Sequence, residues 1–281
     1  MVGPMKVVVL TLDQPNQVAL CHKLQPYCEI AAIVLSENVP RKRPGASRRL
    51  RSLINRVSAR VVGHRFIAAW KQLQRSYEER YTHFPDVPLV RVKNINDAAT
   101  IQILEEKSPD LIIVSGTNLV GRKIIKIASR RGGLLNLHTG LSPYIKGGPN
   151  CTNWCLAEGS FHLIGNTVMW LDAGIDSGNI IASEQTPLTG DETLEELHWK
   201  VMEHAQSMCV SVVSRLARGK PVPSVAQDKI GSGQTYYNTD WALTAMLRAR
   251  SNFKNHYRSY FKDREKQSVR TAGVTVLPIG D

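Results

Sequence analysis

The chain has few cysteines, and they lack the spacing of a disulfide framework or a zinc site. Its 281 residues include five cysteines, an odd number without a Cys-x-x-Cys pair. Cys151 and Cys155 lie four residues apart and can share one helix face, where two small buried apolar side chains are the simplest interpretation. No metal site is therefore predicted.

Long apolar runs are also absent. No run approaches the roughly 20 apolar residues that a helix needs to cross a bilayer. The N-terminus, Met1 to Lys6, has no secretory signal pattern. Hydrophobic residues still make up 42% of the chain, which is ordinary for a globular protein with a substantial core. We therefore expect a cytoplasmic protein without a transmembrane segment.

Acidic residues are missing from one long segment. The formal net charge is +12, and nine Lys or Arg residues with no Asp or Glu lie between Arg41 and Arg65. Such charge attracts nucleotides, folate polyglutamate tails, nucleic acid or an acidic membrane surface. Apolar residues recur at helical spacing in this part of the chain, so we predict a basic helical insertion at 37–86. A solvated helix, an anion-binding helix and a membrane-surface helix remain open.

The remaining chain alternates between β-branched runs and helical patterns. Strands are expected at 6–10, 30–35, 89–92, 110–114, 133–138, 163–171 and 179–186. Helices are expected from about 14, and at 97–107, 122–130, 149–158 and 191–217. This alternation predicts an α/β domain at 1–218 with a mostly parallel sheet. A small C-terminal region follows at 219–281, with a short strand or stacking surface near 234–237 and a basic helix at 241–261. A Gly-x-Gly-x-x-Gly dinucleotide fingerprint is absent.

Three polar residues stand at or after the ends of predicted strands. Asn136 and His138 end one strand, and Asp176 lies in the Asp-Ala-Gly-Ile-Asp-Ser-Gly turn at 172–178. Ligands collect at the carboxyl ends of strands in an open α/β sheet. Each residue alone is compatible with a turn former or a structural side chain. Together they suit attack of an amine on a formyl carbonyl. Asn136 and a protonated His138 can donate to the oxyanion, while Asp176 orients the imidazole and relays a proton.

At these residues the chain resembles the folate-dependent formyltransferases. The resemblance rests on Asn136-Leu137-His138, on the Leu-Ser-Pro loop at 141–143, on the turn at 172–178 and on the strand at 110–116. It covers 88–220 well and 5–36 loosely. It implies a Rossmann-like formyltransferase domain, 10-formyltetrahydrofolate as co-substrate, and Asn136, His138 and Asp176 as catalytic residues. The resemblance also implies a folate site, formed by Ser115, Gly116, Thr117, Leu119, Val120, Asp172 and Gly174.

The acceptor is less well defined than the donor. Glycinamide ribonucleotide formyltransferases carry a glycine-rich phosphate loop after the first strand, whereas this chain reads Thr-Leu-Asp-Gln-Pro-Asn at 11–16. The C-terminal region is shorter than the barrel of methionyl-tRNA formyltransferases. The family context therefore favours a sugar N-formyltransferase that acts on a nucleotide-linked amino sugar for a surface polysaccharide. The residues expected to bind this substrate are Tyr144, Lys146, Tyr236 and Trp241.

Several alternatives stay open. Methionyl-tRNA is one, since the basic segment 41–65 keeps nucleic acid as a partner. A non-catalytic relative that binds an anion, and a hydrolase of the formyl-folate, are two others. The sequence also leaves open the oligomeric state, a homodimer included.

Overall fold

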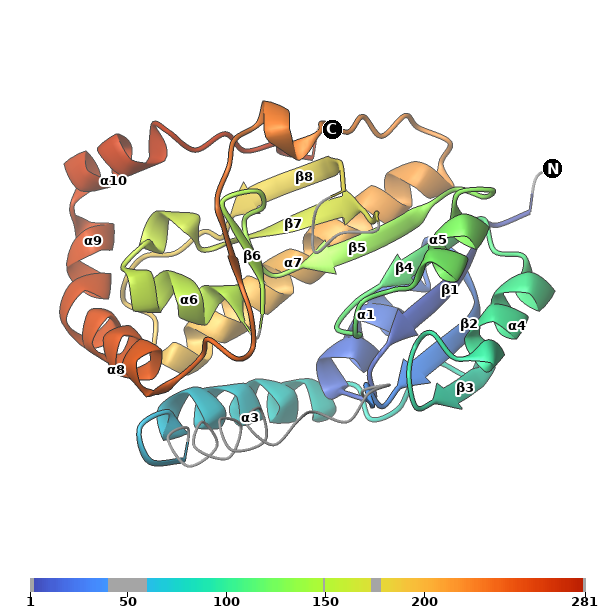
Figure 1. The fold of residues 1–281 in the computed structure, drawn as a ribbon, viewed down its shortest axis with the longest axis horizontal. Coiled ribbons are helices and arrows are strands. Elements are labelled where there is room, and N and C mark those ends of the chain that lie inside the picture. The colour runs from blue at the N-terminus through green and yellow to red at the C-terminus, as the bar shows by residue number, and fades with distance from the viewer. Residues whose placement is uncertain (1–2, 40–59, 149, 173–177, 280–281) are drawn as a thin grey trace.

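The computed structural model describes residues 3–39, 60–148, 150–172 and 178–279, and its centre is a sheet of seven strands (Figure 1). The sequences of these strands are rich in β-branched residues, which pack well on a pleated surface. The strands are β1 (Lys6–Thr11), β2 (Glu29–Ser36), β3 (Leu89–Val92), β4 (Leu111–Val114), β5 (Leu134–His138), β7 (Gly165–Trp170) and β8 (Ile180–Gln185).

The sheet has the order β3-β2-β1-β4-β5-β7-β8. The five strands from β3 to β5 run parallel, and β7 runs antiparallel to both of its neighbours. From β1 the chain moves outward to β2 and β3, whereas from β4 it moves the other way to β5. The order therefore reverses between β1 and β4, which is where α/β sheets form ligand sites. The predicted α/β class and mostly parallel sheet are confirmed.

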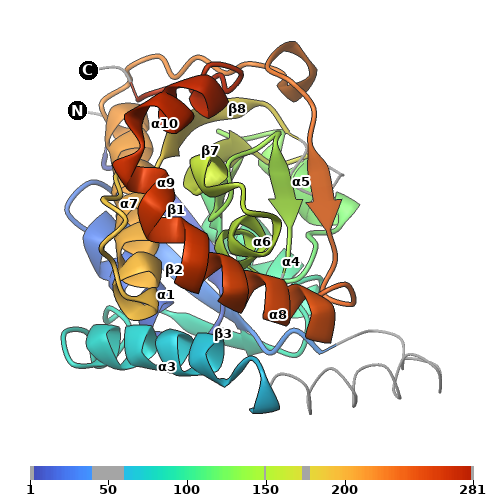
Figure 2. The ribbon, with the colours of Figure 1, turned by 90° about the vertical axis from the view of Figure 1, so that its left-hand side faces the viewer.

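Helices cover both faces of this sheet (Figures 1 and 2). Val7 and Val9 of β1 face α1 and α7, whereas Val8 and Leu10 face α4 and α5. This alternation is the two-residue period of a strand that is buried on both sides. The helices are α1 (Pro15–Leu24), α3 (His64–Glu78), α4 (Ala98–Lys107), α5 (Arg122–Ala128), α6 (Cys151–Glu158), α7 (Leu194–Ala217), α8 (Leu243–Asn252), α9 (Arg258–Lys262) and α10 (Arg264–Thr271). None of these described helices has the length and apolarity to cross a membrane.

The long helix α7 begins at Leu194, three residues after the start that the sequence predicts, and Thr193 caps it. The hydroxyl of Thr193 accepts a hydrogen bond from the backbone N–H of Glu196, and the Glu196 carboxylate accepts one from the N–H of Thr193. This capping box satisfies two N–H groups that the first helical turn leaves unpaired.

Part of the predicted basic insertion is a docked helix. Residues 40–59 lie outside the described residues, but α3 follows them and packs on α1 and α7 through Leu73 and Tyr77. The Tyr77 hydroxyl donates to Glu203 of α7 at 2.6 Å. The end of the insertion thus belongs to the layer of helices under the sheet.

The C-terminal region packs on the rest of the chain through a second, two-stranded sheet. β9 (Gln234–Tyr236) pairs in parallel with β6 (Ile145–Gly147), and α8 packs on α6. The helix expected at 241–261 is interrupted, because a π-helical turn at Phe253–Tyr257 separates α8 from α9. Two short 3₁₀ turns, Phe161–Leu163 and Gln227–Lys229, complete the described elements.

Candidate active site

A cavity of about 1000 Å³ lies at the carboxyl ends of β1, β4 and β5. Its walls come from the ends of these strands and the residues that follow them, from residues 147, 148, 150 and 151 in and after β6, and from 236–239 at the end of β9. Trp70 of α3 and Met202 of α7 add apolar surface. The cavity therefore lies at the point where the strand order reverses, and its volume suits a small-molecule ligand.

Asn136 and His138 both line this cavity from β5. They are two residues apart on one strand, so their side chains leave the same face of the sheet. Asn136 is 8% exposed and lies between Val114 of β4 and Met169 of β7. The structure thus brings together the two side chains that the sequence places at the end of this strand.

The loop after β5 is tied to β7 by Thr167. The Thr167 hydroxyl donates to the carbonyl of Gly140 at 2.7 Å and accepts from the N–H of Ser142 at 2.9 Å. The Ser142–Pro143 bond is cis. A Cβ atom on Gly140 would overlap with Nε2 of His138 and would lie 2.8 Å from Sγ of Cys151. Only glycine leaves room for both side chains here.

Cys151 is a site residue that the sequence did not indicate. Its Sγ lies 3.5 Å from Nε2 of His138 and 3.5 Å from the carbonyl oxygen of Gly147. Cys151 begins α6, and the Asn150 side chain caps this helix by accepting from the N–H of Asn153. The thiol was expected to be a small buried apolar group. It is buried, with 1% exposed, but it contacts the imidazole across a turn that sequence spacing does not reveal.

The loop after β4 is held by hydrogen bonds to its backbone. The hydroxyl of Thr11 donates to the carbonyl of Ser115 at 2.9 Å, and Asn38 accepts from the N–H of Asn118 at 2.9 Å. Asn96 donates to the carbonyl of Leu119 at 2.8 Å. Of the residues predicted for the folate site, Ser115, Gly116, Thr117 and Leu119 line the cavity, whereas Val120 does not.

Gln17 gives a local test of whether a nitrogen heterocycle fits here. Its side chain is 5% exposed, lines the cavity and lies beside Gly116. Among the described residues Oε1 of Gln17 has no hydrogen-bond partner. A buried amide oxygen without a partner is costly, so a ligand N–H group at this point would restore the missing bond. The wall is therefore compatible with a pterin.

The four predicted substrate residues do not gather in one place. Tyr236 lines the cavity and stacks on Trp154, with ring centroids 4.1 Å apart and planes at 17°. Burial raises the pKa of the Tyr236 phenol to about 12, so it stays a neutral hydrogen-bonding group. Trp241 packs edge-on against Trp154 instead of lining the cavity.

The other two substrate residues also lie away from the cavity wall. The Tyr144 hydroxyl accepts from the N–H of Thr275 at 2.7 Å, which holds the ring against the C-terminal segment. Lys146 lies in β6 opposite Thr235. Sequence reasoning missed this arrangement because it depends on a pairing between residues about 90 positions apart.

The turn at 172–178 is described only at its two ends. Asp172 is exposed and does not line the cavity. Gly174 and Asp176 lie outside the described residues. The participation of Asp176 therefore stays a prediction.

The described lining is almost uncharged, despite the net charge of the chain. It contains no Lys, Arg, Asp or Glu, and His138 is the one histidine among the described lining residues. Amides and aromatic rings replace charges. The amide side chains are Gln14, Asn16, Gln17, Asn38, Asn118, Asn136, Asn150 and Asn238, and the rings include Trp70, Tyr236 and Tyr237. Gln14, Asn16 and Gln17 directly follow β1, and this position after the first strand could have indicated from the sequence that they line the site.

Comparisons with known proteins agree with this geometry. The family described as Formyl transferase matches residues 5–213. A methionyl-tRNA formyltransferase from Clostridium beijerinckii is 27% identical over 205 residues, which cover 67% of this chain and 63% of the relative. The chain spans about half the length of the curated relatives it matches.

Solved structures share the fold over most of the chain. A 4-N formyltransferase from Francisella tularensis has a TM-score of 0.55 at 15% identity, with 88% of each chain covered. A sugar N-formyltransferase from a Shewanella species has a TM-score of 0.52 at 14% identity, with 87% of each chain covered. The likeness extends beyond the sheet into the C-terminal quarter.

Proposed function

The chain belongs to the formyl transferase family, and on that premise we propose that it moves a formyl group from 10-formyltetrahydrofolate to the amine of a nucleotide-linked amino sugar. One observation carries the proposal. Asn136 and His138 line the same cavity as the loop 115–119, so the groups that suit formyl transfer face a space large enough for both reactants.

Each catalytic residue has a defined task in this proposal. Bound 10-formyltetrahydrofolate supplies the formyl group. The Asn136 amide and a protonated His138 donate hydrogen bonds to the formyl oxygen as negative charge develops on it. The incoming amine bonds to the formyl carbon and becomes positively charged, and Asp176 accepts its proton. This proton passes to N10 of the folate as the bond between N10 and the formyl carbon breaks, so that tetrahydrofolate leaves. Cys151 and Gly140 hold the His138 ring in place.

The folate would occupy the wall formed by the loop after β4. Ser115, Gly116, Thr117 and Leu119 present backbone groups and a partly apolar surface, and Gln17 offers a buried acceptor. Flat heterocycles bind well to such walls, where a few polar groups set their orientation. The original assignment of Val120, Asp172 and Gly174 to this site remains a proposal.

The uncharged, amide-rich lining supports a sugar as the acceptor. Amides offer donors and acceptors together, which matches the hydroxyl groups of a sugar ring. Tyr236 forms part of this wall, and Tyr237, 54% exposed, offers a face on which a nucleotide base can stack. The diphosphate then lies beyond the described lining, because no Lys or Arg of the described residues faces the cavity. The solved sugar N-formyltransferases share this fold.

The test is a formylation assay with purified full-length chain. We expect 10-formyltetrahydrofolate and one of a panel of nucleotide-linked amino sugars to give a product heavier by one formyl group. The corresponding free amino sugars serve as controls and should react much more slowly, because they lack the nucleotide. Failure of every nucleotide-linked amine, with an active folate donor, would overturn the acceptor class.

A second candidate acceptor is the amine of methionyl-tRNA, because the curated relatives carry that activity in their names. The basic residues between Arg41 and Arg65 would then contact the tRNA backbone. Such binding weakens steeply with salt. Formylation of charged methionyl-tRNA at a rate above that of every nucleotide sugar would favour this candidate.

A further inference from the structure

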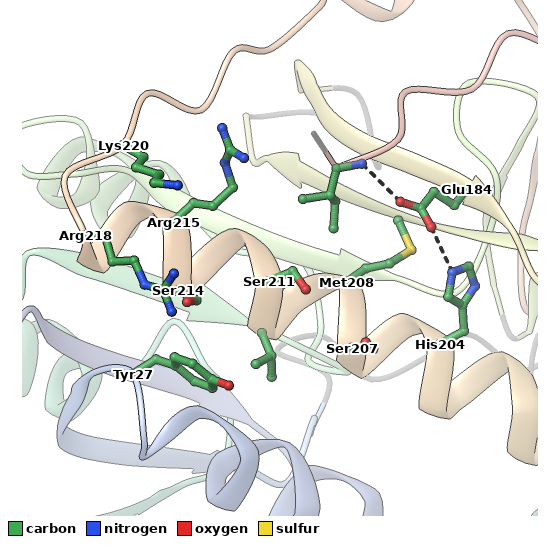
Figure 3. A pocket seen from close by; sticks show the side chains of 12 residues that line it. Tyr27, Glu184, His204, Ser207, Met208, Ser211, Ser214, Arg215, Arg218 and Lys220 are labelled. Carbon is green, nitrogen blue, oxygen red and sulfur yellow. Dashed lines mark hydrogen bonds and ion pairs between the residues drawn. The ribbon is translucent and has the colours of Figure 1, made fainter. Parts of the chain in front are cut away.

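A second cavity lies along α7, lined by a different part of the chain from the candidate active site. Its volume is about 430 Å³, and it runs between α7, the start of β2 and the last described residues (Figure 3). Ser207, Ser211 and Ser214 of α7 line it together with Tyr27 and Ile279. It shares no lining residue with the cavity at Asn136 and His138.

Positive charge gathers at one end of this groove. Arg215, Arg218 and Lys220 point into or across it from the last turns of α7 and the segment that follows (Figure 3). Arg218 and Lys220 are exposed and form no ion pair with any described residue. Arg215 donates to the carbonyl of Pro221, the residue that follows Lys220, at 3.5 Å.

The acidic group of the groove has hydrogen-bonding partners of its own. Glu184, the acidic residue among the described lining, lies at the opposite end. Its carboxylate contacts Nε2 of His204 at 3.0 Å and accepts from the N–H of Ile279 at 3.1 Å. Among the described lining residues, three cationic side chains therefore face this space together with one carboxylate, which has hydrogen-bonding partners of its own.

The negative end of the α7 dipole does not cancel this charge. Its last carbonyls are capped by the backbone, since the N–H of Arg218 contacts the carbonyls of Ser214 and Arg215. The N–H of Gly219 also contacts the carbonyl of Leu216. Bonded carbonyls present less negative charge to an approaching anion than open ones.

Three hydroxyl groups extend the site along the helix. Serine in a helix commonly donates to the carbonyl one turn earlier. The hydroxyls of Ser207, Ser211 and Ser214 make no such bond to any described residue. Their spacing places them on one side of α7, and from Ser207 to Arg218 the helix advances about 16 Å. Serine hydroxyls and cationic side chains thus share one elongated surface.

We propose that this groove is a second ligand site, which binds a small molecule through a di- or triphosphate group. Arg215, Arg218 and Lys220 bind the phosphate oxygens, and the hydroxyls of Ser211 and Ser214 donate to them. Guanidinium groups suit phosphate oxygens because they donate in pairs. The ring of Tyr27, 40% exposed and opposite Arg218, provides a face for the remainder of the ligand.

The experiment is a calorimetric titration of the full chain with inorganic triphosphate, at low salt and at about 0.15 M salt. Arg218→Ala/Lys220→Ala should weaken binding at least about tenfold, because two charge-assisted contacts are lost. Arg250→Ala/Lys254→Ala, which removes two exposed charges from the C-terminal helices, should bind as the unmodified chain does. Ser211→Val should weaken binding by a smaller factor without changing charge.

Two results would overturn the site. One is no measurable binding of triphosphate to the unmodified chain, and the other is an equal loss in the Arg250→Ala/Lys254→Ala control. A parallel titration with ATP separates the sources of the phosphate group. Tighter binding of ATP that Tyr27→Ala removes identifies a nucleotide, whereas equal binding identifies inorganic polyphosphate. These experiments measure binding and not formyl transfer, so their results do not depend on which acceptor the chain formylates. Circular dichroism confirms that each variant is folded.

Discussion

Sγ of Cys151 lies 3.5 Å from Nε2 of His138, while the same sulfur lies 3.5 Å from the carbonyl oxygen of Gly147. A thiol has one proton to donate. If it donates to Gly147, the sulfur can accept from Nε2–H of the imidazole, and this fixes the direction in which that nitrogen points. Cys151 thus positions the imidazole that the proposed reaction uses as a hydrogen-bond donor to the formyl oxygen.

Removal of this thiol should slow turnover without abolishing it. We expect Cys151→Ala to lower kcat about tenfold, since positioning is only part of what an acid–base residue contributes. The pH at which kcat is half-maximal should move as well, and KM for the folate should change less. Cys155→Ala is the matched control, because Cys155 lies one turn later in α6 and is equally buried. Equal effects in both variants would contradict the positioning role.

A methyl group at position 140 should damage the site directly. In Gly140→Ala the new Cβ would overlap with the His138 imidazole, so the ring must leave its observed position. We expect kcat to fall by about 10²-fold or more, a cost that small misplacements of catalytic groups commonly carry. Gly273→Ala, where no described atom lies within 4 Å of the added Cβ, should have no effect. Steady-state kinetics with the same donor concentrations make the comparison.

The proposed donors to the formyl oxygen can be tested by truncating each side chain and, at Asn136, by replacing the amide with a carboxylate of the same shape. Asn136→Ala and His138→Ala should each reduce kcat by about 10²–10³-fold. Asn136→Asp should be worse than Asn136→Ala, because a carboxylate repels the developing charge. Activity of Asn136→Asp above that of the alanine variant would refute the role of the amide. Asp176→Ala should also reduce kcat by orders of magnitude.

Glu192 should make the stability of the chain depend on acid pH. It is 7% exposed, and its carboxylate accepts from Lys200, Thr189, Gly190 and Tyr257. Burial opposes its charge, but these hydrogen bonds outweigh burial and lower the pKa of the carboxyl to about 2 from 4.5. Its contribution is therefore complete above pH 4.5 and is lost as the pH falls toward 2.

Glu192→Gln should remove that acid dependence and lower the free energy of unfolding by about 2–4 kcal/mol near neutral pH. Urea titrations from pH 7 downward measure both effects. Glu195→Gln, a change of the same kind in the first turn of α7, should lower the free energy far less. If the free energy of unfolding of Glu192→Gln fell with pH as steeply as that of the unmodified chain, other carboxylates would be responsible for the acid dependence.

His198 should act in a higher pH window. It is 4% exposed on α7, and burial lowers the pKa of its imidazole to about 4 from 6.5. The unfolded chain therefore binds a proton that the folded chain does not, and stability falls as the pH drops from 6.5 to 4. The loss over this range is about 3 kcal/mol. His198→Leu should flatten this slope, while His256→Ala, at an exposed position, should retain it.

The strands and the polar end of β5 could be predicted because they depend on local pattern. The β-branched runs of β1, β2 and β4 predict buried parallel strands. The positions of Asn136 and His138 could be predicted because both residues lie at the end of such a strand. The hydrogen bond from the Thr167 hydroxyl to the carbonyl of Gly140 could not be predicted, because it joins β7 to the loop after β5 across 27 positions of sequence.

The walls of the cavity depend on longer-range packing. β6 is only three residues long, and no periodicity can be read from so short a segment. Its pairing with β9 brings Tyr236 to the wall, and it leaves Tyr144 bonded to Thr275 and Lys146 outside. The break in the helix at 253–257 is also set by packing, since Tyr257 is buried and donates to Glu192.

The pairing of β6 with β9 brings two distant parts of the chain to the same cavity. The proposed catalytic side chains of β5 come from the first half of the sequence, whereas residues 236–239 of another wall come from its last quarter. Three residue pairs join the two contributions. If the segment after 219 were exchanged between relatives, the wall at 236–239 would be replaced. Asn136 and His138 would stay as they are. In such a fold the choice of acceptor can change through the C-terminal segment alone, while the residues proposed to carry out formyl transfer stay the same.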